Sequence, residues 1–384
     1  MSSSKSIKVA YVIQRFHPTI GGAEAQLLAL LPLMTAQNIE PLVITRGIKG
    51  EPSRDVVNKL PVVRCGSYRY GLMGSLGFFL GAMWQLWRFK PEVVHAFSLM
   101  TPSTIGSAYR ALTGTPLVVK SLRGGIEGDF DRISSKALFE PRRWMLNKSI
   151  DAAQVISQEI DDEFEQLGLC TDKRHRIANG VDLRRAHITG SAQDYRAAMS
   201  IPENAMVFAF VGRLASEKRV DRLIDAYAQA FSEDPDVWLV IAGTGEKEDS
   251  VRKQAASLER VIFLGACDTV AELLKAVNVF VLPSVTEGMS NAMLEAMAAG
   301  LPVIGTDVGA ASELLGEGEH AGQRGILIAP ENTEELRDAM LSLRVRSDLD
   351  ELGARARKYV VDHHSLQNTG SRLVAIYQQC TERA

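Results

Sequence analysis

The sequence predicts an α/β protein with two domains, each built on a parallel β-sheet that helices cover. Three observations support this fold class. The 384 residues are too many for one ordinary core and suit two domains. Short apolar runs alternate with helical patterns along the chain, which is typical of parallel sheets. The alternation starts again after a polar stretch, 183–203, that suits a linker.

The composition is that of a soluble globular protein, with 46% hydrophobic and 23% charged residues. The net charge of −3 gives no support to a nucleic-acid binder, because such proteins need a basic face. The four cysteines lie far apart and form no CxxC pair, which favours a reducing compartment and argues against a zinc or disulfide framework. The first apolar run, 9–13, is too short for a signal-peptide core. We therefore expect a cytoplasmic protein.

The chain opens with a predicted β–α–β unit, made of a strand at 7–13, a helix at 23–36 and a strand at 41–45. The loop before the helix contains Gly21 and Gly22, which let the backbone approach a ligand closely at the helix N-terminus. The loop is not GxGxxG, so the nicotinamide dinucleotide fingerprint is absent there. A plain turn is the alternative explanation for the two glycines.

The longest stretch without charge, 71–87, predicts an apolar helix. It contains several glycines and is slightly short of a bilayer span. One interpretation is a buried helix of the first domain. The other is a helix, flanked by Arg69, Arg88 and Lys90, that rests on a membrane surface.

Two further candidate residues of the first domain lie at or just after the carboxyl end of a predicted strand. His95 falls at the carboxyl end of a strand at 91–97, where open α/β sheets place ligands, although a structural role is equally open. Arg123 follows a strand at 116–120 and offers a rigid guanidinium for a carboxylate or phosphate. It cannot act as a general base, and its alternative role is surface pairing with Glu127 or Asp129.

Between 127 and 148 the sequence is mixed and basic. One interpretation is a solvated helix face. The other is attraction to an anionic acceptor or to lipid head groups.

In the second domain, a strand at 205–211 leads directly to Arg213, and Lys218 comes near the start of the next helix. Both cations are expected at the carboxyl edge of the sheet. Two cations that converge there can bind a diphosphate and stabilise it as a leaving group. The strand at 237–242 ends at Gly243, which suits a nucleoside lying over the strand edge or a plain turn.

The most informative stretch is EGMSNAMLEAMAAGLPVI, which follows an apolar strand at 277–282. Ser290 or Asn291 is a good N-cap for a short helix, which Gly300 ends. The N–H groups and positive dipole end of this helix suit a phosphate. Glu287 in the loop and Glu295 inside the helix are unfavourable beside an anion unless they hold hydroxyls or cations. Sugar and ribose hydroxyls meet that need.

These stretches together resemble the retaining glycosyltransferases of family GT4, which have the GT-B fold. Glu287 and Glu295, with seven residues between them, match the two-glutamate signature of that family. VGRLASEK resembles its diphosphate-binding loop, GGAE its glycine-rich loop, and NGVD the segment that ends its first domain. The resemblance covers almost the whole chain and is most specific from 211 to 303.

The resemblance implies two Rossmann-like α/β domains that face each other across a cleft. We expect residues 1–190 to form an acceptor-binding domain and residues 191–362 to form a nucleotide-sugar-binding domain. Residues 363–384 are expected to form a last helix that packs back on the first domain.

The resemblance also implies a retaining hexosyltransferase that uses a nucleotide-diphosphate sugar, with a UDP-sugar expected. Glu287 is then expected to hold a hydroxyl of the donor sugar, and Glu295 the ribose hydroxyls. Arg213 and Lys218 would stabilise the departing diphosphate, in place of a metal ion. The other expected donor contacts are Gly21, Gly22, Gly243, Ser290, Asn291 and Ala292. No metal and no cofactor are expected.

The family often carries a histidine where this chain has Arg123, so a mechanism that relies on that histidine is in doubt. Arg123 and His95 remain candidates beside the reacting sugar. The expected acceptor is a glycan or a lipid-linked glycan of cell-envelope or exopolysaccharide biosynthesis, with a peripheral contact at the inner membrane face left open. Two alternatives remain: a nucleotide-sugar epimerase of the same fold, and a non-catalytic nucleotide-sugar-binding partner of another glycosyltransferase.

Overall fold

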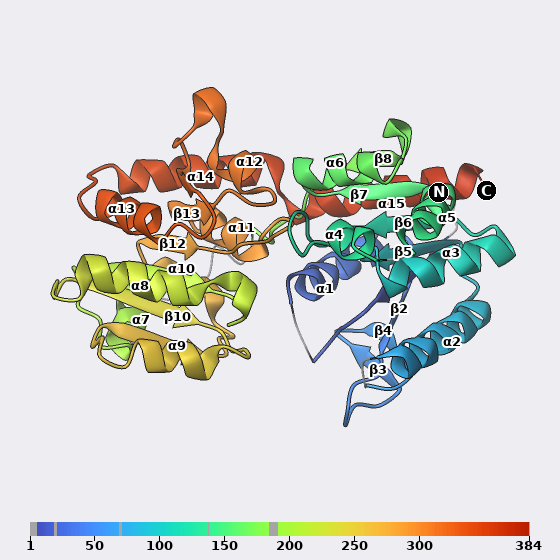
Figure 1. Cartoon of the computed structure of the whole chain (residues 1–384), viewed down its shortest axis with the longest axis horizontal. Coiled ribbons are helices and arrows are strands. Elements are labelled where there is room, and N and C mark those ends of the chain that lie inside the picture. The colour runs from blue at the N-terminus through green and yellow to red at the C-terminus, as the bar shows by residue number, and fades with distance from the viewer. Residues whose placement is uncertain (1–5, 19–20, 69–70, 137, 184–190, 384) are drawn as a thin grey trace. The chain divides into compact units, whose positions relative to one another are not determined.

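The computed structural model describes residues 6–18, 21–68, 71–136, 138–183 and 191–383. The chain divides into two compact units, which are 1–179 with 366–384, and 180–365. Each unit holds one β-sheet with helices on its faces (Figure 1). This arrangement confirms the two-domain α/β fold.

The first unit has an eight-stranded sheet in the order β3-β4-β2-β1-β5-β6-β7-β8. All neighbours in this sheet are parallel except the pair β3 and β4. Its strands are β1 Ile7–Ile13, β2 Ile39–Arg46, β3 Arg54–Val57, β4 Leu60–Cys65, β5 Val93–Phe97, β6 Leu117–Lys120, β7 Ala152–Val155 and β8 Arg174–Arg176. Its helices are α1 Gly22–Thr35, α2 Leu72–Phe89, α3 Thr101–Thr113, α4 Asp129–Ser134, α5 Phe139–Ser149, α6 Gln158–Gln166 and α15 Leu366–Arg383.

The second unit has a six-stranded parallel sheet in the order β11-β10-β9-β12-β13-β14. Its strands are β9 Met206–Val211, β10 Val237–Ala242, β11 Val261–Gly265, β12 Val279–Leu282, β13 Val303–Thr306 and β14 Gly325–Ile328. Its helices are α7 Ala192–Ala198, α8 Val220–Phe231, α9 Glu248–Gln254, α10 Val270–Ala276, α11 Asn291–Ala298, α12 Ala311–Leu315, α13 Thr333–Arg344 and α14 Leu349–His363.

Each sheet has one point where the strand order reverses. In the first unit β2, β4 and β3 lie on one side of β1, and β5 and the later strands lie on the other side. In the second unit β10 and β11 lie on one side of β9, and β12 and the later strands lie on the other side. Loops that leave such a pair of strands in opposite directions open a crevice at the carboxyl edge, where α/β proteins bind ligands. The order therefore directs attention to the loops after β1, β5, β9 and β12.

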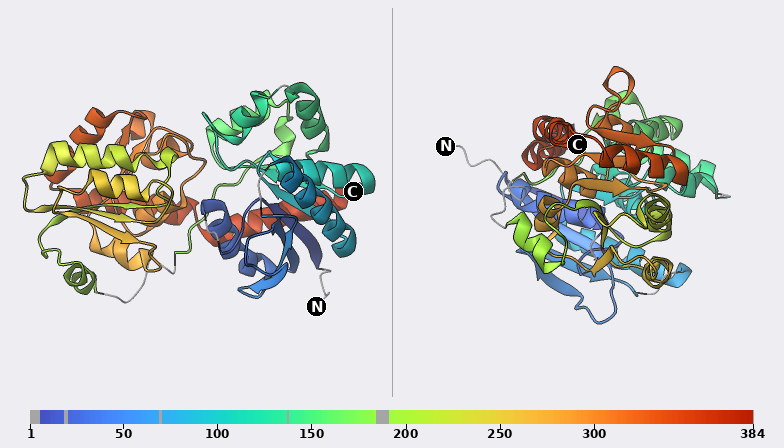
Figure 2. Two further views of the ribbon diagram at one scale, coloured as in Figure 1. Left: turned by 60° about the horizontal axis from the view of Figure 1, so that its bottom comes forward. Right: turned by 90° about the vertical axis from the view of Figure 1, so that its left-hand side faces the viewer.

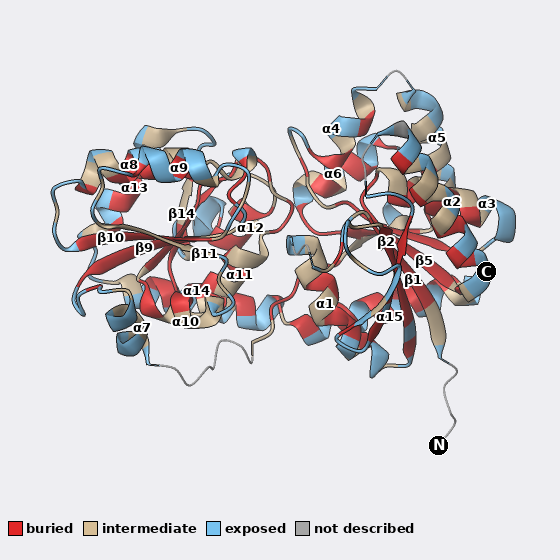
Figure 3. Cartoon of the chain, turned by 90° about the horizontal axis from the view of Figure 1, so that it is seen from below, coloured by how far each residue is buried: buried red, intermediate tan, exposed pale blue. Residues whose placement is uncertain are grey.

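The last helix, α15, belongs to the first unit, as expected. It lies beside α1 and also contacts β5; in Figure 2 it is the red helix beside the blue start of the chain. Its buried side chains include Leu373, Ile376 and Tyr377, which join the core of the sheet. Figure 3 shows the central strands of each sheet, such as β5 and β9, as mostly buried.

The junctions between the units lie at 179/180 and 365/366, whereas the sequence predicts 190/191 and 362/363. Val181 pairs with Ser365 in a short parallel bridge, and its N–H donates to the carbonyl of His364 at 2.8 Å. This pairing joins residues just after Asn179 to the end of α14. Residues 184–190, where the first boundary was expected, lie outside the described residues.

Candidate active site

Lys218 and Glu287 come together at the carboxyl edge of the second sheet. Lys218 lies in the loop after β9, and Glu287 lies in the loop after β12, so they flank the point where the strand order reverses. Their ammonium and carboxylate groups form an ion pair, and their side chains are only 18% and 14% exposed. Lys218, which the sequence predicts to bind the diphosphate, and Glu287, which it predicts to bind the donor sugar, are therefore in direct contact.

The loop after β9 is shaped so that Lys218 points to this place. Ser216–Lys218 forms a 3₁₀ turn rather than the start of α8, and Arg219 has a φ of 50°. The N–H of Val285 donates to the carbonyl of Glu217 at 2.9 Å, which fastens the loop after β12 to this turn. Lys218 therefore lies near the start of α8, as the sequence predicts, and belongs to the short connector just before it.

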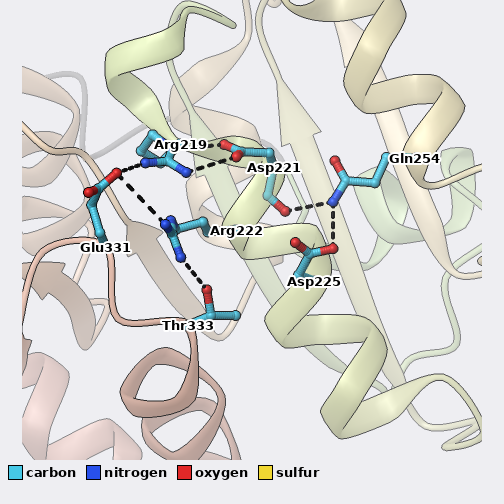
Figure 4. Close-up of polar contacts among 7 residues, drawn as sticks. All are labelled: Arg219, Asp221, Arg222, Asp225, Gln254, Glu331 and Thr333. Atoms are coloured by element: carbon cyan, nitrogen blue, oxygen red, sulfur yellow. Dashed lines mark hydrogen bonds and ion pairs between the residues drawn. The ribbon is translucent and has the colours of Figure 1, made fainter.

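A polar network holds the residue that follows Lys218 (Figure 4). Arg219 forms ion pairs with Glu331 and with Asp221, the latter at 3.1 Å, and Arg222 donates to Thr333 at 2.9 Å. This network ties the start of α8 to the loop before α13. It fixes the left-handed backbone of Arg219, which is strained for a residue with a side chain. Arg219 was not predicted as a site residue, because its partner Glu331 lies 112 residues away in the sequence.

The loop after β12 is held equally closely. The carbonyl of Gly288 accepts a hydrogen bond from the N–H of Ala310 at 2.8 Å. Gly309 has a φ of 60°, and a Cβ atom added there would lie 2.4 Å from that same carbonyl oxygen. Only glycine permits this approach. A small hollow results beside Glu287, and its lining also includes Leu282, Ser290, Met293, Thr306, Val308, Ala310, Ala311 and Leu314.

Helix α11 begins at this hollow. The hydroxyl of Ser290 accepts a hydrogen bond from the N–H of Met293 at 3.3 Å, so Ser290 is the N-cap. Asn291 and Ala292 form the first turn, and both are half-buried. Glu295 lies one turn further along and is also half-buried. The positive end of the helix and two glutamates are therefore close in the fold, as the sequence predicts.

Arg213 lies after the same strand as Lys218 but has other partners. Its guanidinium is ion-paired with Glu217 and lies 3.8 Å from Glu246, and its side chain is 44% exposed. Both acidic residues were missed by the sequence analysis; Glu246 follows the GTG turn after β10. Arg213 is therefore a cation at the same sheet edge that is balanced by two carboxylates.

Gly243 is required by the packing of the loops. Its φ is 137°, and a Cβ atom there would lie 1.8 Å from the carbonyl oxygen of Gly212. The N–H of Gly212 donates to the carbonyl of Ala242 at 3.0 Å, so the loops after β9 and β10 run in direct contact. This explains the glycine structurally, whether or not a nucleoside lies over it.

In the first unit, Gly21 and Gly22 start α1 after β1. Both are exposed, and the N–H of Gly21 donates to the carboxylate of Glu24 at 3.0 Å. The preceding residues 19 and 20 are outside the described part of the chain. The glycine pair thus lies at an exposed helix N-terminus on the carboxyl edge of its own sheet.

His95 is a correction to the sequence analysis. It occupies the middle of β5, is fully buried, and its Nδ1 lies 2.7 Å from the hydroxyl of Tyr377 on α15. Burial, together with the nearby charge of Lys120, lowers the pKa of His95 to about 3, so the ring is neutral. The strand was placed correctly, but this side chain points into the core under α15. A histidine so enclosed cannot contact a sugar.

Arg123 lies half-buried in the loop after β6, next to Asp129. The carboxylate of Asp129 accepts hydrogen bonds from the N–H groups of Leu99 at 3.1 Å and Leu122 at 3.3 Å. Burial raises the pKa of Asp129, and these hydrogen bonds and the charge of Arg123 oppose the rise. Asp129 therefore joins the loops after β5 and β6. The charge of Arg123 thus acts on a buried carboxylate, whereas the alternative offered from the sequence was a pairing on the surface.

Glu163 of α6 supports the same loop and was not foreseen. Its Oε1 accepts a hydrogen bond from the N–H of Gly125 at 2.7 Å, and its Oε2 is buried without a hydrogen-bond partner among the described residues. Burial, reinforced by the charges of Glu159, Asp129 and Asp131, raises the pKa of Glu163 to about 8. The one available signal is the spacing of Glu159 and Glu163, which places two carboxylates on one face of a helix.

Two structural features of the described residues concern metals and membranes. Within that part of the chain, no group of three or more His, Cys, Asp and Glu side chains is arranged to hold a metal ion. No helix there is both long enough and apolar enough to cross a bilayer.

Comparison with known families identifies both halves of the chain. Residues 20–185 match the family described as "Glycosyltransferase Family 4". Residues 205–344 match the family described as "Glycosyl transferases group 1". The second match contains the loops that carry Lys218, Glu287 and Glu295.

Curated relatives agree with these matches. The chain is 27% identical over 325 residues to the 2-deoxystreptamine N-acetyl-D-glucosaminyltransferase of Streptomyces fradiae, with 77% of each chain covered. It is 29% identical over 233 residues to the UDP-Gal:alpha-D-GlcNAc-diphosphoundecaprenol alpha-1,3-galactosyltransferase of Escherichia coli, which covers 57% of this chain and 58% of that relative.

Solved structures share the fold. The sucrose-phosphate synthase of Thermosynechococcus elongatus has a TM-score of 0.82 and 18% identity, over 98% of this chain and all of that one. The Anabaena protein HepE in complex with UDP-glucose has a TM-score of 0.78 and 19% identity, over 97% and 99% of the two chains. At these identities the likeness concerns the GT-B architecture.

Proposed function

The chain belongs to the GT4-type glycosyltransferases, and from this premise we propose that it is a retaining hexosyltransferase that uses a UDP-sugar. The proposed acceptor is a hydroxyl group of a glycan or of a lipid-linked glycan in cell-envelope or exopolysaccharide biosynthesis. Two printed names support the choice of donor and acceptor. HepE is described in complex with UDP-glucose, and the Escherichia coli relative is named for UDP-Gal and a diphosphoundecaprenol acceptor.

The observation that carries the proposal is the ion pair of Lys218 and Glu287 at the N-terminus of α11. A cation, a helix dipole and a carboxylate at one sheet edge match the two parts of a nucleotide sugar that flank its reacting bond, the diphosphate and the sugar. The ammonium and the helix N-terminus suit the diphosphate. The carboxylate suits a sugar hydroxyl. In the absence of donor, these two opposite charges neutralise each other.

The donor would be held as follows. Lys218, Arg213 and the first turn of α11 (Ser290, Asn291 and Ala292) bind the diphosphate, and Glu295 accepts hydrogen bonds from the ribose. Glu287 exchanges its ion pair with Lys218 for a hydroxyl of the donor sugar. This exchange places the anomeric carbon beside the cations that stabilise the leaving group. Gly243 lets the backbone approach the nucleoside, and Gly21 and Gly22 would lie near the diphosphate.

The transfer breaks the bond between the anomeric carbon and the β-phosphate oxygen. The acceptor oxygen forms the new bond from the same face of the sugar, and its proton passes to the departing phosphate oxygen. The proposal assigns no metal ion to this step, because Lys218, Arg213 and the dipole of α11 supply the positive charge. Arg123, in the loop after β6, would hold an anionic group of the donor or acceptor.

The two alternatives are not favoured. The curated relatives described above are named as transferases, and neither is named as an epimerase. The non-catalytic alternative rested on Arg123 alone. The ion pair of Lys218 and Glu287 at the sheet edge of the second unit supports the catalytic proposal instead. We also infer a site of action in the cytoplasm.

The proposal is tested first by thermal shift with UDP-, GDP-, ADP- and dTDP-sugars in the presence of EDTA. Because ligand binding to the native state raises the melting temperature, a rise with UDP-sugars alone supports the assigned donor and binding without metal. The rise should be lost in Glu295→Ala. A rise with another nucleotide class, or no rise with any, would contradict the donor assignment.

The stereochemistry needs a second measurement. Transfer from the UDP-sugar that binds, followed by ¹H NMR of the product, gives the configuration at the anomeric carbon. An α-linked product from an α-configured donor supports retention, whereas a β-linked product refutes it. An altered nucleotide sugar without any transferred glycan would indicate the epimerase.

A further inference from the structure

Helix α2 presents a row of large apolar side chains to solvent. These residues recur at helical spacing on its outer face and are between 49% and 79% exposed. They are Met73, Leu76, Leu80, Trp84 and Trp87. A monomeric soluble protein rarely leaves so continuous an apolar row uncovered, and such a row marks an interaction surface.

The inner face of the same helix combines glycines, which allow a close approach to the strands and loops beneath, with large buried side chains such as Leu86. A Cβ atom added at Gly81 would lie 2.9 Å from the Cβ of Cys65, and one added at Gly77 would lie 3.5 Å from the Cα of Gly66. Phe78 and Ala82 complete this face and are fully buried. An ordinary surface helix turns its larger apolar residues inward and its polar residues outward. α2 differs because large apolar residues occupy its outer face as well as its inner face.

The charges around this face are positive. α2 contains no acidic residue, and it ends at Arg88 and Lys90. The guanidinium of Arg88 lies 5.7 Å from the ring of Trp84. Tryptophan beside arginine is the combination that favours the boundary between lipid head groups and acyl chains.

The neighbouring helices continue the pattern. α2 lies beside α3, and α3 lies beside α5, on one side of the first sheet (Figure 1). The outer side of α5 carries Trp144, which is 66% exposed, and the ammonium of Lys148 lies 5.1 Å from its ring. Leu112 at the end of α3 is also exposed.

We propose that the outer face of α2 docks on the surface of an anionic lipid bilayer, with the helix lying parallel to the membrane plane. The apolar row enters the boundary region, and Arg88, Lys90 and Lys148 contact anionic head groups. Docking rather than spanning follows from the helix itself, which has one face committed to the core. The inference goes beyond the proposed function and stands apart from it, because it rests on α2 and its neighbours alone.

A second copy of the chain fits this face less well. Two α2 helices packed together would bury the apolar rows, but they would offer no anion to Arg88 and Lys90, because the helix carries no acidic residue. An anionic bilayer satisfies both the apolar row and the cations.

The test is flotation of the full chain with vesicles of phosphatidylcholine alone, or with about one third phosphatidylglycerol. We expect binding to the anionic vesicles, weakened by salt. Leu80→Ser with Trp84→Ser should reduce binding at least ten-fold. Arg88→Gln with Lys90→Gln should reduce it by about five-fold per residue, and only on anionic vesicles. Val345→Ser, at an exposed apolar residue of the second unit, is the matched control and should bind normally.

Each variant is checked by circular dichroism and by its melting temperature, so that loss of fold is separated from loss of binding. Sedimentation of the protein without vesicles shows whether it is a monomer or a dimer. If the chain fails to bind anionic vesicles but forms a dimer that Trp84→Ser dissociates, a second copy covers this face and the proposal is wrong. Failure to bind by a folded monomer also overturns it. Because thermal shift with UDP-sugars reports the second unit, failure of this proposal leaves the proposed function unaffected.

Discussion

The ammonium of Lys218 and the carboxylate of Glu287 neutralise each other across 69 residues of sequence, at the edge where the donor diphosphate and sugar are proposed to meet. The pair is mostly buried, so removal of one partner leaves the other charge in a site with little water. Such a loss is more costly than breaking an exposed pair. The two residues should therefore behave as one unit in catalysis.

The first prediction concerns this unit. Lys218→Gln and Glu287→Gln should each lower kcat by about 10²–10³-fold, as expected when a preorganised group at a developing charge is removed. The double variant should be little worse than either single variant, because the two groups act together. Steady-state kinetics with the UDP-sugar that binds measures all three.

Arg346→Gln is the matched control, since Arg346 forms an exposed ion pair with Asp348 in the same unit. It should leave kcat unchanged. Full activity of Lys218→Gln or Glu287→Gln, or additive losses in the double variant, would contradict the shared role.

The second prediction separates the two glutamates. Glu295→Gln should weaken UDP binding by about 10–100-fold, because hydrogen bonds to a charged group contribute about 1.5–3 kcal/mol. Titration calorimetry with UDP and with dUDP, which lacks the 2′-hydroxyl, locates the contact. The native chain should discriminate between the two nucleotides, and Glu295→Gln should not. Equal discrimination in both chains would remove the ribose from the role assigned to Glu295.

The sequence was sufficient for much of this picture where local chemistry decides the structure. The alternation of apolar runs and helical patterns predicted the two sheets, which are parallel except for the pair β3 and β4. The phrase around Glu287 and Ser290 predicted a loop, an N-cap and a helix. Those features depend on residues within one turn or strand of each other. The approach of Lys218 to the same edge followed from the rule that parallel strands end on one side.

The sequence was insufficient where distant segments decide which face is covered. The strand that contains His95 was predicted, but His95 lies in its middle rather than at its carboxyl end, and its side chain is enclosed in part by Tyr377, 282 residues later. The orientation of α2 could not be predicted, because its glycines and its tryptophans are both compatible with a buried helix. Glu163 was missed because its environment is made by a loop from another part of the fold.

The third prediction concerns the contact between loops at Gly243. Gly243→Ala should lower the melting temperature strongly and abolish UDP binding, because the new Cβ would lie 1.8 Å from the carbonyl oxygen of Gly212. Gly265→Ala is the control, since Gly265 also has a positive φ, 67°, but has open space around it. It should cost only the backbone strain of about 1–2 kcal/mol. Equal melting temperatures for the two variants would contradict the close-contact explanation.

The fourth prediction follows from the burial of His95. Its pKa in the folded protein is about 3, below the ordinary value of 6.5. As the pH falls from 6.5 toward 3, the unfolded chain binds a proton that the folded chain does not, so stability falls. His95→Gln should flatten this decline in melting temperature. It should not remove an ionisation near pH 6.5 from the pH–rate profile, and the loss of such an ionisation would restore His95 as a catalytic candidate.

The fifth prediction uses Glu163, whose pKa is raised to about 8 from an ordinary value of 4.5. Between these two values the unfolded chain has lost its proton and the folded chain has kept it. Stability therefore falls as the pH rises from 4.5 to 8, and does not fall further above 8. Glu163→Gln keeps the acceptor for the N–H of Gly125 and carries no charge. Its melting temperature should exceed that of the native chain by an amount that grows from pH 5 to pH 8.

Glu165→Gln is the control on the same helix, because Glu165 is exposed and pairs with Arg174. Its melting curve should follow that of the native chain at every pH. The loop that contains Arg123 gives a second readout, since a neutral side chain at 163 keeps that loop in place above pH 8, where the native glutamate ionises. Donor turnover by Glu163→Gln should therefore persist to higher pH than turnover by the native chain. If the two pH profiles coincide, Glu163 does not position this loop.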